Sequence, residues 1–181
     1  MKPEPKRIIG AEGERTANLL GAAALAIAEA VTGAISVSGG RSEAAKAALA
    51  VLLQWPPRSI GHLAKVLRRS HSATVRLIEE LEGQGLVAKN ASEDRRAIAL
   101  KLTAQGRREA GRIVAARGDM LGDMVGRLDS AERRTLTRLL ERLLPVLTPD
   151  REACDHICRL CELAACPQDR CPVERAARAS A

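Results

Sequence analysis

Apolar residues recur at helical spacing along most of the chain, and strand-like alternation stands in one place only. The spacing predicts helices over residues 14–38, 42–53, 59–67 and 70–83. Ser42, Ser59 and Ser70 stand where N-caps are expected, and Pro56 ends the second helix because proline disfavours helix in the residue before it. The third and fourth helices are short, amphipathic and joined by a tight turn, which is typical of a helix-turn-helix.

A hairpin is predicted directly after the helix-turn-helix. Residues 86–89 and 97–102 alternate apolar and polar side chains around the polar, charged loop 90–96, which indicates two strands and a wing. Helix is expected again over 103–128 and over 129–145, where Pro145 ends it. The predicted fold class is therefore mainly α: a winged helix-turn-helix with a small β-hairpin wing and long helices at both ends.

The helix over 70–83 carries side chains suited to reading bases. Its apolar stripe faces the core, so its opposite face presents Ser70, His71, Ser72, Val75 and Arg76. Arg76 can form a bidentate contact with guanine, the serine and histidine can hydrogen-bond, and Val75 can meet a thymine methyl. Glutamates at 79, 80 and 82 are repelled by phosphates, so only the N-terminal half of the helix is expected to enter a groove. In the wing, Arg95 and Arg96 suit the minor groove or adjacent phosphates.

Composition and charge agree with a polyanionic partner. The formal net charge is +7, and the 34 residues from Thr148 onward carry −1, so the preceding 147 residues carry +8. Phe and Tyr are absent and Trp occurs once, so the core is expected to consist of Leu, Ala, Val and Ile. The sequence contains no phosphate-binding Gly-rich loop after a strand, no Gly-x-Ser-x-Gly and no His-Glu-x-x-His, so we do not expect an enzyme.

Two segments resemble the multiple-antibiotic-resistance regulator (MarR) family. Residues 70–77 with 81–82 and 85–87 resemble its recognition helix and exit, and residues 94–106 resemble its wing signature, an Asp-Arg pair followed by an apolar strand and Leu-Thr-x-x-Gly. The resemblance implies a homodimer with interleaved terminal helices that binds a palindromic operator in double-stranded DNA and represses transcription. It places the DNA contacts on the recognition-helix residues and wing arginines named above, and it implies no fixed effector site.

The domain organisation follows from these segments. Residues 1–13 are a lead-in, residues 14–147 form the winged-helix domain, and residues 148–181 form a Cys-rich tail. Within the domain, the DNA-binding core covers about 42–103, and the dimerisation helices cover about 14–38 and 104–147. Gly118, Gly122 and Gly126 recur every four residues beside an apolar stripe, which would let a second backbone approach, although packing within one chain could explain the same pattern.

The location is expected to be cytoplasmic. The longest uninterrupted apolar stretch, residues 19–28, is about half of the roughly 20 residues that cross a membrane. Acidic residues at 4, 12 and 14 also stand where a signal peptide is basic.

All five cysteines lie in the tail: Cys154, Cys158, Cys161, Cys166 and Cys171. An intracellular protein is not expected to use them as a disulfide framework. Four of the five could hold zinc or an iron–sulfur cluster, and metal-free structural or redox-active thiols are the third alternative. His156 is expected to be exposed and at best a spare ligand, and His62 is expected on the exposed side of its helix.

The functional prediction is a sequence-specific transcriptional regulator that acts as a homodimer. Its signal is expected to be metal or redox state at the Cys-rich tail. The alternatives are a small-molecule effector with a purely structural tail, and a redox protein. A scaffold protein is disfavoured because protein contact does not require a charged hairpin beside a helix-turn-helix.

Overall fold

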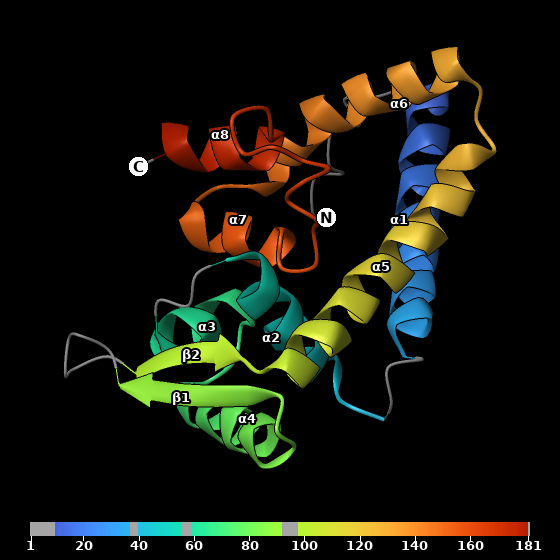
Figure 1. Cartoon of the computed structure of the whole chain (residues 1–181). Helices are drawn as coiled ribbons and strands as arrows, with labels where there is room; N and C mark the ends of the chain where they lie inside the picture. Colours follow the sequence, from blue (N-terminus) through green and yellow to red (C-terminus); the bar gives the residue numbers. More distant parts are fainter. Residues whose placement is uncertain (1–9, 37–39, 56–58, 92–97, 181) are drawn as a thin grey trace, which may run out of the picture.

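The computed structural model describes residues 10–36, 40–55, 59–91 and 98–180. Helices dominate it, with one two-stranded antiparallel sheet (Figure 1). The elements in chain order are α1 (Ala11–Ile35), α2 (Glu43–Gln54), α3 (Ile60–Val66), α4 (His71–Gly83), β1 (Val87–Ala91), β2 (Ile98–Leu102), α5 (Ala104–Gly126), α6 (Ser130–Leu143), η1 (Leu144–Leu147), α7 (Arg151–Ile157) and α8 (Pro172–Ala179). The predicted fold class is confirmed.

Side-chain caps fix the starts of the helices. Ser42, Ser59 and Ser70 each accept a hydrogen bond from a backbone N–H in the first turn of α2, α3 and α4, as predicted. Thr103 does the same for α5, and Asp129 forms a reciprocal capping box with Glu132 at the start of α6. These caps satisfy N–H groups that have no partner inside the helix, so the local sequence determines where each of these helices begins.

The core of the winged-helix domain lies between α2, α4, α5 and the hairpin. Its fully buried large side chains are Leu49, Ile78, Leu81, Leu86, Leu100 and Ile113. Small side chains of α2 fill the space between them, since Ala45, Ala47, Ala48 and Ala50 are all buried. In the hairpin, Val87 pairs with Leu102 and Lys89 with Leu100, which turns Val87, Leu100 and Leu102 into the core.

The long helices α1 and α5 pack along each other on one side of the molecule, and α6 continues from the far end of α5 (Figure 1). Much of their apolar surface is uncovered: Leu19 is 54% exposed and Leu25 is 71% exposed, and α6 buries no residue. Gly118, Gly122 and Gly126 are exposed, and an added Cβ at any of them would meet nothing within 4 Å. The predicted small-residue stripe is therefore open in a single chain.

By length and composition, α1 could cross a membrane: it has 25 residues, and an 18-residue window has a mean hydropathy of 1.6. The sequence expectation considered only the uninterrupted run 19–28, whereas the surrounding Ala, Gly and Thr extend the apolar character over the whole helix. A helix that covers an apolar face of another chain passes the same test.

The Cys-rich tail folds back onto the helix-turn-helix (Figure 1). His62 on α3 pairs with Asp155 of α7 at 3.1 Å, and the Nδ1 atom of His156 lies 2.8 Å from the carbonyl oxygen of Val66. The backbone N–H of Leu163 donates to the side-chain oxygen of Gln54 at 3.3 Å. The expectation that both histidines are exposed is therefore wrong. The tail covers the side of α3 that its sequence pattern alone assigns to solvent.

Candidate DNA-binding surface and cysteine pocket

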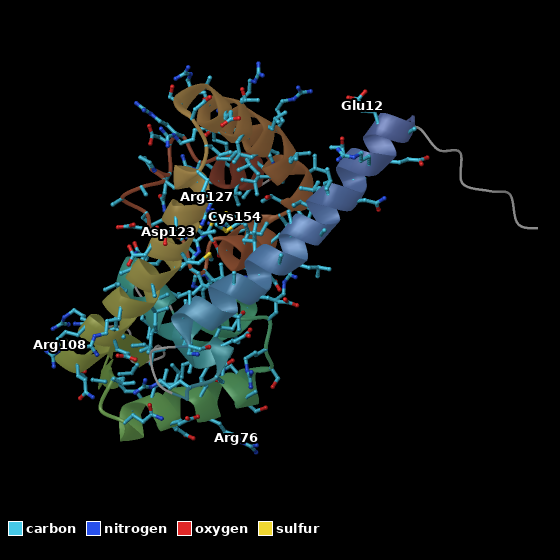
Figure 2. All side chains as sticks on the ribbon, turned by 90° about the vertical axis from the view of Figure 1, so that its right-hand side faces the viewer. Glu12, Arg76, Arg108, Asp123, Arg127 and Cys154 are labelled. Carbon is cyan, nitrogen blue, oxygen red and sulfur yellow. The ribbon has the colours of Figure 1, made fainter. Side chains whose placement is uncertain are left out.

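The recognition helix α4 presents the predicted polar face to solvent. Thr74, Leu77, Ile78 and Leu81 are buried, as their spacing predicted. The opposite face begins with Ser70, His71, Ser72 and Arg76, which are exposed, and Val75, which is partly buried. Figure 2 shows Arg76 on the outer side of α4, at the end of the molecule far from Arg127. The structure thus brings the five candidate base-reading residues together on one surface.

A tight turn holds α4 against α3. Arg68 in this turn has a φ of +50°, a conformation that L-residues adopt at a cost of roughly 1–2 kcal/mol. The N–H of Arg69 returns to the carbonyl of Ala64 at 2.9 Å, and the hydroxyl of Thr74 donates to the carbonyl of Ser70 at 3.0 Å. These bonds fix the direction in which the first turn of α4 leaves the domain.

The hairpin is attached to both neighbouring helices. Lys89 forms a 2.8 Å ion pair with Glu82 at the end of α4. The N–H of Thr103 donates to the carbonyl of Leu86 at 3.0 Å, and its hydroxyl donates to the carbonyl of Gly85 at 2.7 Å. The base of the wing is therefore joined to both α4 and α5. Arg95 and Arg96 lie outside the described residues, so their contribution stays a prediction.

Arg41 is a positioning residue that the sequence pattern did not reveal. Its Nε donates to the side-chain oxygen of Gln84 after α4, and its Nη1 donates to Glu109 of α5, both at 2.9 Å. Glu109 is buried, so the pair anchors the chain entering α2 to two other helices. Only the fold brings these residues together, since they lie 43 and 68 positions from Arg41.

All five cysteines line one small pocket in the tail, as a shared site required. Cys154, Cys158 and Cys171 are buried, Cys161 and Cys166 are partly buried, and none forms a disulfide. Cys158 stands directly after α7 and Cys171 directly before α8, so the pocket lies where the connection between these two helices returns to its starting point. Among the described residues, no group of three or more His, Cys, Asp or Glu is arranged around a point that could hold one metal ion.

The thiols differ in their protonation. Burial raises the pKa of Cys154 to about 12, and its Sγ lies 3.6 Å from the carboxylate of Glu174, to which it donates. A hydrogen bond from Cys158 lowers the pKa of Cys161 to about 6, and the charges of Arg117 and Arg159 act in the same direction. Cys161 is therefore the thiol most readily present as thiolate near neutral pH.

Trp55 joins the pocket to the winged-helix core. It packs against both apolar clusters and lines the cysteine pocket. Its indole Nε1 is buried and has no hydrogen-bond partner within the described part of the chain.

A second, larger cavity of about 580 Å³ lies where α1, α2, α3 and the tail meet. Four arginines line it: Arg68, Arg69, Arg117 and Arg159. Burial, followed by the like charge of Arg68, lowers the pKa of Arg159. Glu43 is the one acidic residue in the described lining, so the cavity is strongly basic.

Comparisons with known proteins agree with this geometry. Residues 42–98 match the model of the MarR family. A Thauera aromatica protein named for transcriptional regulation of the hcr operon is 35% identical over 96 residues, which are 52% of this chain and 58% of that protein. The match thus spans less than two thirds of that relative.

Solved MarR structures share the fold. A MarR family protein from Bacillus stearothermophilus superposes with a TM-score of 0.64 at 20% identity, covering 78% of this chain and 96% of that one. A Mycobacterium tuberculosis MarR family protein in complex with DNA has a TM-score of 0.56 and 27% identity, covering 70% and 95%. Its complex with p-aminosalicylic acid superposes at 0.55, with 29% identity over 70% and 96%. Together with the buried stripe of α4 and the hairpin, these matches show that residues 42–98 form a winged helix-turn-helix similar to that of the MarR family of transcriptional regulators, to which this chain adds a Cys-rich tail.

Proposed function

We propose that this regulator binds duplex DNA as a homodimer, in the cytoplasm, by inserting the first two turns of α4 into the major groove. The observation that carries the proposal is the exposed face of α4, formed by Ser70, His71, Ser72 and Arg76, on a helix whose opposite side is buried in the core. Arg76 supplies the guanine contact, His71 and Ser72 hydrogen-bond, and Val75 meets a thymine methyl. Arg95 and Arg96 of the wing extend the contact along the backbone.

The homodimer is supported by the apolar surface that one chain leaves open. Exposed side chains of α1 and α6, including Leu20, Leu25, Leu139 and Leu140, would be covered by the same elements of a second copy. Large apolar side chains exposed together on two helices commonly mark a protein–protein contact. Two copies of α4 related by a two-fold axis would then match two half-sites about one helical turn apart, which is the geometry of a palindromic operator.

The experiment starts from duplexes selected from a random pool by repeated binding to the wild-type protein. Fluorescence anisotropy then compares wild type with Arg76→Ala and with Arg127→Ala, which removes the same charge far from α4 (Figure 2). We expect Arg76→Ala to weaken binding roughly 5- to 150-fold, the equivalent of about 1–3 kcal/mol, and Arg127→Ala to leave it near wild type. Equal binding by both variants would remove α4 from the interface.

Repression is the expected consequence of such binding. A selected operator placed over a reporter promoter should lower reporter expression when the wild-type protein is present, and Arg76→Ala should restore it. Higher expression with the wild-type protein would identify an activator instead.

The basic cavity favours a second candidate function, regulation by a small organic anion. Four arginine side chains around about 580 Å³ provide space and charge for an aromatic or aliphatic carboxylate, and the cavity touches the turn between α3 and α4 through Arg68 and Arg69. A bound anion would relieve the repulsion between Arg68 and Arg159. The probe is p-aminosalicylate: it should release the selected duplex from wild type and act at higher concentration on Arg159→Leu, whereas an unchanged affinity for DNA would refute this role for it.

A further inference from the structure

The cysteine pocket lies apart from the exposed face of α4, and it is the centre of the tail's own small core. That core consists of Cys154, Cys158 and Cys171 with Val173 and Ala177, and partly buried apolar residues around them. Between the end of α7 and the start of α8 the described backbone forms turns and bends without a helix or strand. So small a core gains little from apolar burial, and domains of this kind usually rely on a disulfide or a metal. All five cysteines are free of disulfides.

We propose that Cys158, Cys161, Cys166 and Cys171 bind an iron–sulfur cluster in this pocket. The four come from the connection between α7 and α8 and from the two helix ends that flank it, and they surround one cavity. Four cysteine thiolates are the usual ligand set of such clusters. The proposal does not depend on DNA binding, since its primary readout is the metal itself.

Cys154 lies outside this ligand set. Cys154 is 1% exposed, and its Sγ lies 3.6 Å from the carboxylate of Glu174. Arg151 and Arg178 hold that carboxylate in place at 2.7 and 2.9 Å. A thiol that donates to a fixed carboxylate already has a partner, and its thiolate would be repelled there. The fifth cysteine is therefore explained as a structural hydrogen-bond donor.

Trp55 provides an independent sign that the pocket receives an acceptor. Its buried Nε1–H has no partner among the described residues, and its ring lines the same cavity as the thiols. Buried donors are nearly always paired, so an unpaired one requires an explanation. Sulfur atoms of a cluster or its thiolates accept N–H hydrogen bonds, and such bonds tune the reduction potential of the cluster.

Acid-labile sulfide separates a cluster from a single ion. Four thiolates around one zinc ion bind it without inorganic sulfide. An iron–sulfur cluster carries sulfide together with its iron, so the sulfide content tells the two occupants apart.

The cluster would also hold the tail on the helix-turn-helix. Asp155, His156 and Leu163 flank the proposed ligands and contact His62, Val66 and Gln54. Metal binding stabilises the fold of the segment that supplies the ligands. Loss of the cluster is thus expected to loosen these contacts with α3.

The test measures iron and acid-labile sulfide per chain in the full-length protein, purified without oxygen and treated with ferrous iron and sulfide. We expect equal amounts, two or four of each, with visible cluster absorbance. Cys154→Ser is the matched control, because serine can still donate to Glu174, and it should keep the wild-type content. Cys161→Ser and Cys171→Ser should each lose most of it. Zinc without sulfide, or no metal, would overturn the proposal, and loss of iron in Cys154→Ser would overturn the ligand assignment.

A second variant keeps the test decisive if a cysteine variant fails to fold. Trp55→Phe retains an aromatic ring but removes the N–H donor. It should keep the full iron and sulfide content and shift the reduction potential of the cluster to a more negative value, because the lost hydrogen bond stabilised the more negative, reduced form. An unchanged potential with a full cluster would exclude the contact with Trp55.

Discussion

Among the described glycines, Gly106 is the one at which an added methyl group is expected to lower the stability of the fold most. It lies in the first turn of α5, beneath the base of the wing. A Cβ added there would lie 1.9 Å from the carbonyl oxygen of Leu86 and 3.3 Å from a methyl carbon of Leu102. The same carbonyl accepts the hydrogen bond from the N–H of Thr103. The glycine of the Leu-Thr-x-x-Gly pattern is therefore explained by close approach between helix and hairpin.

The size of the effect follows from that geometry. Alanine at 106 would need α5 and the backbone at Leu86 to separate by about 1 Å, since real Cβ contacts stay above 3.0 Å. Overpacking of this kind costs about 1–3 kcal/mol, and weakening of the Thr103 bond adds about 1 kcal/mol. The better helix propensity of alanine returns about 1 kcal/mol. The expected net loss is about 1–3 kcal/mol, or a fall in Tm of roughly 2–12 °C.

Thermal and urea unfolding of Gly106→Ala at one fixed protein concentration measure this loss. Gly111→Ala is the matched control, because it lies in the same helix and a Cβ there meets nothing within 4 Å. We expect the control to gain about 0.4–1 kcal/mol. If Gly106→Ala is as stable as the control, the close approach of α5 to Leu86 is wrong.

Three further predictions concern the cap of α4 and the tail. Ser70→Ala removes the hydroxyl that accepts the hydrogen bond from the N–H of Ala73. It should lower the free energy of unfolding in urea by about 1 kcal/mol and weaken binding of the selected duplex. Unchanged stability and unchanged binding would mean that the cap is not formed. In metal-free protein, the rate at which iodoacetamide alkylates Cys161 should rise with pH, with a midpoint near pH 6. Cys161→Ser should lack this reaction. A midpoint near pH 9 would contradict the lowered pKa of Cys161. Burial raises the pKa of Glu174, but hydrogen bonds from Arg151 and Arg178 outweigh it and hold the pKa below the ordinary 4.5. Its stabilising contribution is therefore present above pH 4.5 and lost as pH falls through the lowered value, so the stability difference between wild type and Glu174→Gln should shrink on acidification rather than grow.

The sequence was sufficient wherever local chemistry decides the structure. Ser42, Ser59 and Ser70 were identified as caps because a hydroxyl before an amphipathic run can bond only a few positions away. The buried face of α4 followed from its 3.6-residue period, and so did the exposed face that contains Arg76. The wing was visible because alternating flanks enclosed a charged loop.

The sequence was insufficient wherever a contact joins distant segments. His62 and His156 were expected in solvent, since nothing local indicates that the tail covers α3. The bridge from Arg41 to Gln84 and Glu109 likewise depends on three separate elements. Convergence of the cysteines could be expected from their density, but the separate role of Cys154 required the position of Glu174.

The central claim, that α4 and the wing read duplex DNA, is tested most directly by the salt dependence of binding to the selected duplex and to a scrambled one. Wild type should bind the selected duplex more tightly, with log K falling linearly with log salt by about 0.9 per phosphate contact. Arg76→Ala should lose the preference and keep nearly the same slope for the scrambled duplex. Equal, salt-independent affinity of wild type for both duplexes, or no affinity for either, would contradict the account.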